Sequence, residues 1–228
     1  MKSTTENSAQ NSQEVKNLFT LSVPIRLIIY IAGIVILSFG ITLNTKSLLG
    51  VSPIISMPYT ISVLSGGALG VLTFLFYIAF IFLQFVFLRR EFELTRLLQI
   101  FISFVTSAFI QLFDYLLPIP ENMIVRFIIL ATAIILTGIG AALTVTMRFA
   151  PNPADGLADV IGRKSGKDFG FGKNLFDLLS LLFSVSIGLI FGRKIIGIGI
   201  GTVLSMIFTG RVIALLQKPL NRFMIKER

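Results

Sequence analysis

The sequence of 228 residues contains no cysteine, histidine or tryptophan, and only 14% of its residues are charged. Without thiols or imidazoles the chain forms no disulfide and no Cys/His zinc site, and it has no imidazole for acid–base catalysis. An intramembrane enzyme would have to rely on Asp, Ser, Lys or Tyr, and no cluster of these is evident. The sequence therefore predicts a protein without metal or cofactor that is not an enzyme.

Apolar residues make up 54% of the chain and the mean hydropathy is +0.89, which is unusual for a soluble domain of this length. A helix needs about 20 residues to cross a bilayer, and the uncharged stretches reach that length. They are too long for the roughly 10-residue strands of an outer-membrane barrel. We therefore predict an all-α membrane protein with six transmembrane helices. The expected spans are 27–46, 67–88, 97–117, 127–147, 174–192 and 195–216.

The net charge of +9 is distributed unevenly along this expected topology. If the six spans alternate, all Lys and Arg residues lie on the side of the termini except Lys46, Arg126, Arg193 and Lys194. This bias is the positive-inside signal of plasma-membrane proteins, so both termini are expected in the cytoplasm. The basic residues are then a topology signal and a contact for anionic lipid, and they do not indicate nucleic-acid binding.

Residues 33–70 and 133–170 are identical at eight positions with a constant offset of 100 residues. Most of these positions hold Gly, Pro or Ser, and Gly and Pro in particular set backbone shape. Because each copy has three spans, the two copies would enter the membrane in opposite orientations, as in many secondary transporters. The predicted units are a disordered cytoplasmic tail at 1–22, inverted three-helix repeats at 23–120 and 121–218, and a cytoplasmic tail at 219–228.

Each copy contains an interrupted segment that opens with a polar residue before proline, Ser52-Pro53 or Asn152-Pro153, and closes in Ser-Gly. These are helix start and stop signals, so each segment predicts a helix of about ten residues, too short to span. One interpretation is a pair of re-entrant helices whose N-termini point inward and suit polar or anionic solutes. The alternative is two amphipathic helices on the membrane surface.

The predicted solute site lies between these two short helices, and the charged residues belong to the second copy. Asp155 and Asp159 are four residues apart and share one helix face, where Asp159 can also pair with Arg163. The alternative role for Asp155 is to stabilise the helix N-terminus. The candidate substrate-binding residues are Pro53, Ser56, Tyr59, Pro153, Asp155, Gly156 and Asp159.

Asp177 and Arg211 lie inside the fifth and sixth predicted spans. Intramembrane charges are costly and usually paired, so we expect a buried ion pair between them. The alternative is that each side chain reaches separately to the interface.

Several glycines fall within predicted spans, including the run GIGIGT at 197–202. No strand–helix unit surrounds this run, so a dinucleotide fingerprint is a poor explanation. Small residues that let helices approach closely explain it better. The same role is expected for Gly33, Gly40, Gly138 and Gly140.

The segment PNPADGLADVI at 151–161, followed by NLFDLLS and GIGIGTVLSMIFTGRVI, resembles the YczE/YyaS/YitT family of bacterial membrane proteins over residues 26–218. The resemblance implies a polytopic protein of the bacterial plasma membrane and does not imply a reaction. Ala150-Pro151 stands where similar proteins often carry Gly. The motif residues carried over are Gly40, Pro153, Asp155, Gly156, Asp177, Gly199 and Gly201.

Two functions fit these features. The first is a secondary transporter or permease for a small solute, supported by the repeats, the interrupted segments and the few intramembrane charges. The alternative is an accessory or regulatory protein embedded in the membrane, which binds another membrane protein. The expected partners are the lipid bilayer and an unknown small solute, with a homodimer or a membrane-protein partner as further options.

Overall fold

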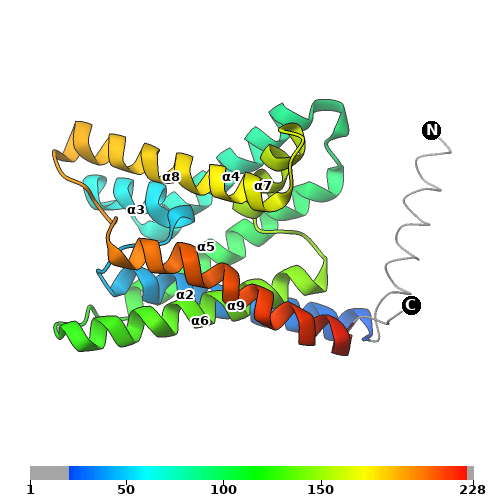
Figure 1. Ribbon diagram of the computed structural model, residues 1–228, viewed down its shortest axis with the longest axis horizontal. Helices are drawn as coiled ribbons and strands as arrows, with labels where there is room; N and C mark the ends of the chain where they lie inside the picture. Colours follow the sequence, from blue (N-terminus) through cyan, green and yellow to red (C-terminus); the bar gives the residue numbers. More distant parts are fainter. Residues whose placement is uncertain (1–20, 225–228) are drawn as a thin grey trace.

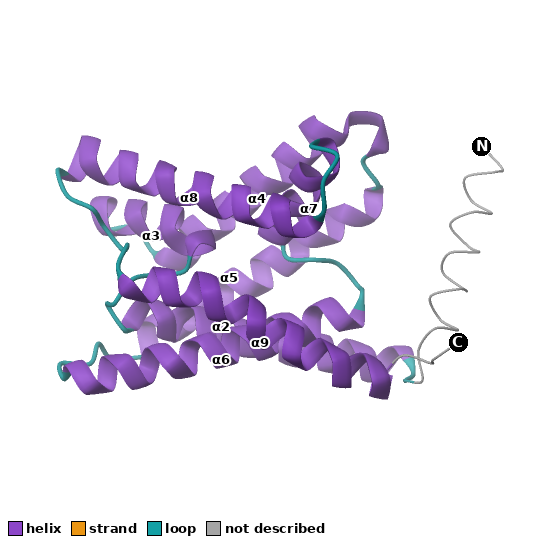
Figure 2. Ribbon diagram, in the orientation of Figure 1, coloured by secondary structure: helices purple, strands orange, loops and turns teal. Residues whose placement is uncertain are grey.

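The computed structural model describes residues 21–224, which form helices joined by short loops, with no strand among them (Figures 1 and 2). Six of these helices are long and apolar enough to cross a membrane, as predicted. The long helices are α2 (Val23–Lys46), α4 (Leu69–Leu88), α5 (Leu98–Leu116), α6 (Met123–Met147), α8 (Phe169–Gly192) and α9 (Ile200–Met224). The shorter elements are α3 (Pro53–Ser65), α7 (Pro153–Lys164) and the 3₁₀ turns η1 (Arg89–Glu91) and η2 (Leu94–Leu97).

The helix ends differ from the expected spans for local reasons. Helix α8 begins five residues earlier because the Asp168 side chain accepts a hydrogen bond from the Phe171 amide at 3.0 Å and caps it. Helix α9 begins later because Gly197 adopts a positive φ of 70°. It continues to Met224, so residues 219–224 are helical where a tail was expected. The expected tail residues 1–20 and 225–228 lie outside the described residues.

Both short helices begin at their proline, as predicted. The Asn152 side chain caps α7 by accepting from the Ala154 amide at 3.0 Å. The expected cap by Ser52 is wrong, because its side chain makes no capping bond and its amide donates to Asn44 Oδ1 at 2.7 Å. Helix α3 ends at Gly66, whose φ of 69° stops the helix.

Helices α2 and α6 pack along each other extensively and approach most closely at glycines. A Cβ on Gly40 would lie 2.6 Å from the Thr137 backbone nitrogen, and one on Gly140 would overlap the Leu37 backbone. The predicted close packing at small residues is therefore confirmed here. Gly199 and Gly201 also pack tightly, but against the backbone of Leu49 and Gly50, which belong to a loop and not to a helix.

The order long, short, long, long occurs twice along the described chain, in α2–α5 and in α6–α9. The neighbours correspond as well: α2 packs on α5 and α6 on α9, while α3 and α7 each pack on both α4 and α8. The pattern breaks at one place. Helix α4 packs along α5, with Gly70 N–H donating to Gln111 Oε1 at 2.9 Å, whereas α8 and α9 diverge without extended contact (Figure 1).

The short helices lie toward opposite ends of the bundle, and α7 lies at the end where α2 begins and α9 ends (Figure 1). Their N-terminal turns converge on one apolar cluster. Ala154 of α7 is fully buried there beside Tyr77 of α4, and Ile54 and Met57 of α3 pack against the same cluster. The first turn of each short helix is thus held in the protein interior.

Candidate functional site

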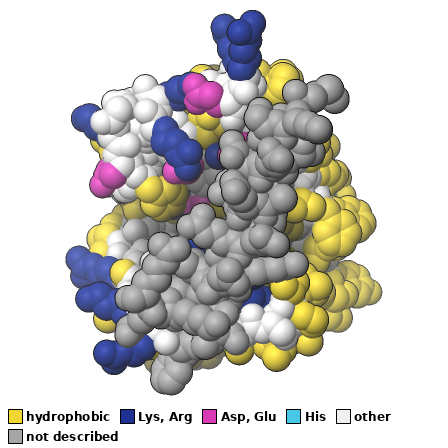
Figure 3. All heavy atoms as spheres, turned by 90° about the vertical axis from the view of Figure 1, so that its right-hand side faces the viewer, with side chains coloured by type: hydrophobic (Ala, Val, Ile, Leu, Met, Phe, Trp, Pro, Cys, Tyr) yellow, Lys and Arg dark blue, Asp and Glu magenta, His cyan; other side chains and the backbone are white. Residues whose placement is uncertain are grey.

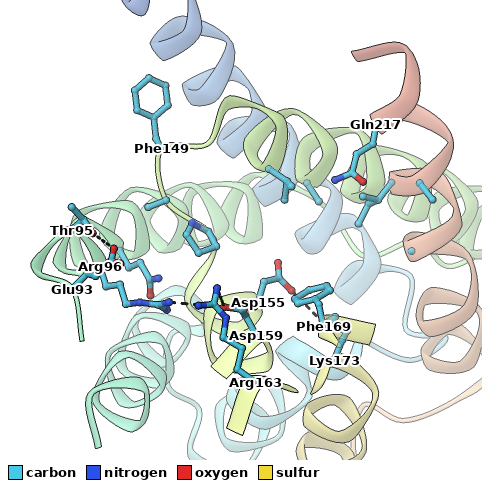
Figure 4. Close-up of a pocket in the computed structure, with 18 residues that line it drawn as sticks. Glu93, Thr95, Arg96, Phe149, Asp155, Asp159, Arg163, Phe169, Lys173 and Gln217 are labelled. Atoms are coloured by element: carbon cyan, nitrogen blue, oxygen red, sulfur yellow. Dashed lines mark hydrogen bonds and ion pairs between the residues drawn. The ribbon is translucent and has the colours of Figure 1, made fainter. Parts of the chain in front are cut away.

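A cavity of about 700 Å³ lies where α8 and α9 diverge. Its lining includes Arg163 of α7, which is exposed, so the cavity extends toward the end of the bundle that carries α7 (Figure 4). Lys and Arg side chains gather on this end of the molecule, and apolar side chains flank it (Figure 3). Its polar lining comes from the segment before and within α5, from α7, α8 and α9. These residues are Glu93, Thr95, Arg96, Gln99, Asp155, Asp159, Arg163, Lys173 and Gln217.

Lys173 of α8 lies between two carboxylates. Its ammonium donates to Asp177 Oδ1 at 2.9 Å and lies 3.6 Å from Asp155 Oδ1. The Asp177 side chain is only 8% exposed, so its charge is compensated by Lys173 one turn earlier on the same helix. The expected Asp177–Arg211 pair is therefore wrong, because Lys173 is the partner of Asp177. Arg211 is exposed, and its guanidinium carbon lies 5.5 Å from the centre of the Phe208 ring.

Asp159 of α7 is held by two guanidinium groups. Arg163, one turn later, lies 2.8 Å away, as expected, and Arg96 approaches from η2 to 3.9 Å. Arg96 also donates to Gln84 Oε1 at 3.0 Å, which connects the cavity wall to the buried polar residues behind it.

Two fully buried glutamines lie behind α7. Gln84 of α4 donates to Gln99 Oε1 of α5 at 2.9 Å and to the Pro153 carbonyl at 3.1 Å. A Cβ on Gly156 would lie 2.9 Å from Gln84 Oε1 and 3.0 Å from Gln99 Nε2. The absence of a side chain at Gly156 therefore lets the glutamine pair reach the first turn of α7, where the buried Gln84 amide finds an acceptor in the Pro153 carbonyl.

The chain leading into α7 is fixed from α2 and α4. Arg26 donates to the Met147 carbonyl at 2.6 Å, and the Tyr30 hydroxyl donates to the Ala150 carbonyl at 2.8 Å. The Asn152 amide donates to the Tyr77 hydroxyl at 3.3 Å. These long-range bonds determine where Asp155 and Asp159 enter the cavity.

The structure brings together only part of the predicted site. Asp155 and Asp159 line the cavity, whereas Gly156 and Pro153 lie behind it against the glutamines. The α3 residues do not line it. Ser56 is fully buried and donates to the carbonyls of Pro53 and Ser180, and Tyr59 packs against Gly197. Helix α3 contributes packing, not lining.

Sequence reasoning missed Lys173, Gln84, Gln99 and Arg96 as site residues. Lys173 stands four residues before Asp177, a spacing that itself indicates a pair. The glutamines lie in or beside apolar spans, where amide side chains are costly and need partners. Arg96 carried no signal beyond its contribution to the charge bias, because its partner Asp159 is distant in sequence.

The residues of this cavity can bind a polar solute through carboxylates, guanidinium groups and one ammonium. Within residues 21–224 no group of three or more acidic side chains is placed to hold a metal ion. The lining residues can therefore hold a solute by ion pairs and hydrogen bonds in a partly apolar cavity.

Comparison with known proteins places the chain among membrane proteins. A family of unknown function, DUF6198, matches residues 24–218. The chain belongs to this family. YczE of Bacillus subtilis strain 168, described as an uncharacterized membrane protein, is 26% identical over 190 residues, which cover 83% of this chain and 84% of YczE. YyaS of the same organism is 27% identical over 203 residues, covering 87% and 96% of the two chains.

These relatives confirm the resemblance to YczE and YyaS that the PNPADGLADVI segment predicted. Together with the six apolar helices, they make this member of the DUF6198 family a membrane protein. No solved structure matches the chain significantly.

Proposed function

We propose that this protein is a secondary transporter for a small solute, and that the cavity between α8 and α9 is its solute site in an inward-open state. The observation that carries the proposal is the cavity itself. A chamber of about 700 Å³ is large enough for a small molecule, and charged side chains of both signs line it.

The repeated packing order supports a transporter built from two inverted repeats, 23–120 and 121–218. In such proteins one half rocks against the other, so a gap in one half corresponds to a closed contact in its counterpart. The closed α4–α5 contact and the open α8–α9 gap fit that relation. On this proposal α3 and α7 are re-entrant helices entering from opposite sides.

We place the protein in the inner membrane of a bacterial cell, with the cavity open toward the cytoplasm. The basis for this orientation is the excess of Lys and Arg on the side of both termini. Helix α7, which lines the cavity, lies at the end of the bundle where α2 begins and α9 ends (Figure 1).

Transport is tested with purified protein in proteoliposomes, under an imposed proton or sodium gradient, supplied with a bacterial small-molecule extract. Mass spectrometry of the lumen is expected to find at least one solute accumulated relative to empty liposomes. Asp155→Asn should abolish this accumulation, because the substitution keeps size and capping ability while removing the charge. Asp168→Asn is the matched control, since Asp168 caps α8 outside the cavity and Asn also caps. No accumulated solute, or accumulation unchanged in Asp155→Asn, contradicts the proposal.

An accessory role is the second candidate, favoured by the surface of α9. This helix packs mainly on α6 and leaves large apolar side chains outward, among them Val203, Met206 and Ile207. A helix of another membrane protein would bury that face. Co-purification of a single stoichiometric partner, lost when these three residues are changed to Ser, would support this role over transport.

A further inference from the structure

Two carboxylates one helical turn apart on α7 face the cavity. The balance of positive and negative side chains differs between the surroundings of the two. Asp155 and Asp159 are separated by about 6 Å along the helix axis, since an α-helix rises 1.5 Å per residue. Both line the cavity and both side chains remain partly exposed to it, 26% for Asp155 and 30% for Asp159 (Figure 4).

The Asp155 end carries an excess of negative charge. Here two carboxylates share one ammonium, because Lys173 binds Asp177 at 2.9 Å and stands farther, at 3.6 Å, from Asp155. Asp155 therefore keeps acceptor capacity that faces the cavity. Phe169 lines the same cavity (Figure 4) and offers an aromatic surface to a cation.

The Asp159 end carries an excess of positive charge. Two guanidinium groups, Arg96 and Arg163, share one carboxylate there. Glu93 also lines the cavity, but it is exposed to water and accepts from the Thr95 hydroxyl at 3.2 Å. Arg163 is exposed as well, so the cation that water screens least at this end is Arg96, whose side chain is 16% exposed.

The remaining wall is apolar. Ala141 and Val145 of α6, with Ile213 and Ala214 of α9, line the same chamber. A solute that binds across the cavity thus meets two charged ends along α7 and an aliphatic surface from α6 and α9.

We propose that the cavity selects a zwitterion with an apolar body, its ammonium group at Asp155 and its anionic group at Arg96 and Arg163. A simple cation would leave the guanidinium end without a new partner, and a simple anion would leave Asp155 without one, so each gains at one end only. This assignment rests on the proposed role of the cavity as a solute site. Two sources share this chemistry: a free amino acid with an apolar side chain, and the headgroup of phosphatidylethanolamine.

The test is thermal unfolding of the full chain, purified in a neutral detergent, with matched probes. Leucine is compared with isoamylamine, which lacks its carboxylate, and with isocaproate, which lacks its amine; phenylalanine, phenethylamine and hydrocinnamate form a second set. Nanodiscs of phosphatidylethanolamine and of phosphatidylglycerol provide the lipid arm. We expect a zwitterion to bind about tenfold or more tighter than either of its singly charged counterparts, as removal of a charged hydrogen-bonding partner implies.

Substitutions at the two ends of the cavity test which residue binds which charged group, because each should change which probe binds most tightly. Asp155→Asn should shift the preference toward isocaproate, and Arg163→Gln toward isoamylamine. Asp168→Asn should leave the order unchanged. Stabilisation by phosphatidylethanolamine nanodiscs alone, with no effect of free amino acids, would identify the lipid headgroup as the source.

A singly charged probe that binds as tightly as its zwitterion, or an absence of binding in all arms, overturns the assignment. The transporter proposal is judged separately by accumulation from the extract. Accumulation of a singly charged solute would support transport and contradict selectivity for a zwitterion. Binding of a zwitterion without accumulation would support that selectivity and contradict transport.

Discussion

Lys173→Met should destabilise the protein by about 2–3 kcal/mol. Removing one partner of a buried ion pair typically costs 3–5 kcal/mol, because the other charge remains buried and uncompensated. Asp177 is 8% exposed and fits that description, but Lys173 is 25% exposed, so solvent screening lowers the expected cost. The substitution also removes the cation nearest to Asp155 of α7, so that carboxylate is left without its ion pair too.

Two further variants test the same reasoning. The double change Lys173→Met with Asp177→Leu should recover stability to within about 1 kcal/mol of the unaltered chain, since an apolar replacement removes both buried charges. Arg211→Met is the matched control and should cost less than about 1 kcal/mol, because Arg211 is exposed and contacts only the Phe208 ring among the interactions described.

The assay is SDS titration of the purified protein followed by far-UV circular dichroism, which needs no tryptophan. Three outcomes would refute the argument. One is a cost for Arg211→Met equal to that of Lys173→Met, which would restore the Asp177–Arg211 pair. The others are a double variant as unstable as the single one, and a single variant with no loss at all.

Further substitutions address the core behind the cavity and the topology. Gly156→Ala should cost about 1–3 kcal/mol, because its Cβ would press on Gln84, whereas Gly210→Ala meets no atom within 4 Å and should be neutral or slightly stabilising in the same titration. Gln84→Leu should cost about 1–3 kcal/mol, because the buried Gln99 side chain loses its amide partner while Arg96 and the Pro153 carbonyl each lose one hydrogen bond, and an unchanged midpoint would show that these bonds contribute nothing. Reporter fusions at residue 120 should score outside, and those at 168 and 228 inside; an outside signal at 228 would overturn the orientation.

The sequence was sufficient for the membrane spans and the starts of the short helices. Long uncharged runs admit few structures other than helices in a bilayer, and Pro53 and Pro153 mark helix starts because proline is accepted at the first helical position. The contacts of Gly40 and Gly140 could also be anticipated, since close helix approach needs small residues.

The sequence predicted the Asp159–Arg163 pair, but it led to the wrong partner for Asp177. Depth in the membrane made Asp177 and Arg211 natural partners, but α8 and α9 diverge, and Lys173 reaches Asp177 within one helix. The sequence also did not show that α3 lies outside the lining of the cavity. Its N-terminus does approach α7, yet apolar side chains such as Ile54 and Met57 fill the space between them, and the cavity opens on the other side of α7.

The central claim is that the cavity opens to one side of the membrane and then to the other. The natural absence of cysteine allows a direct test with a single Ala214→Cys in the cavity wall, labelled by a membrane-impermeant maleimide in inside-out and right-side-out vesicles. The account predicts fast labelling from the cytoplasmic side and slower but measurable labelling from the outside, both reduced by bound solute. Labelling from the cytoplasmic side alone, at any membrane potential or ion gradient, would contradict transport.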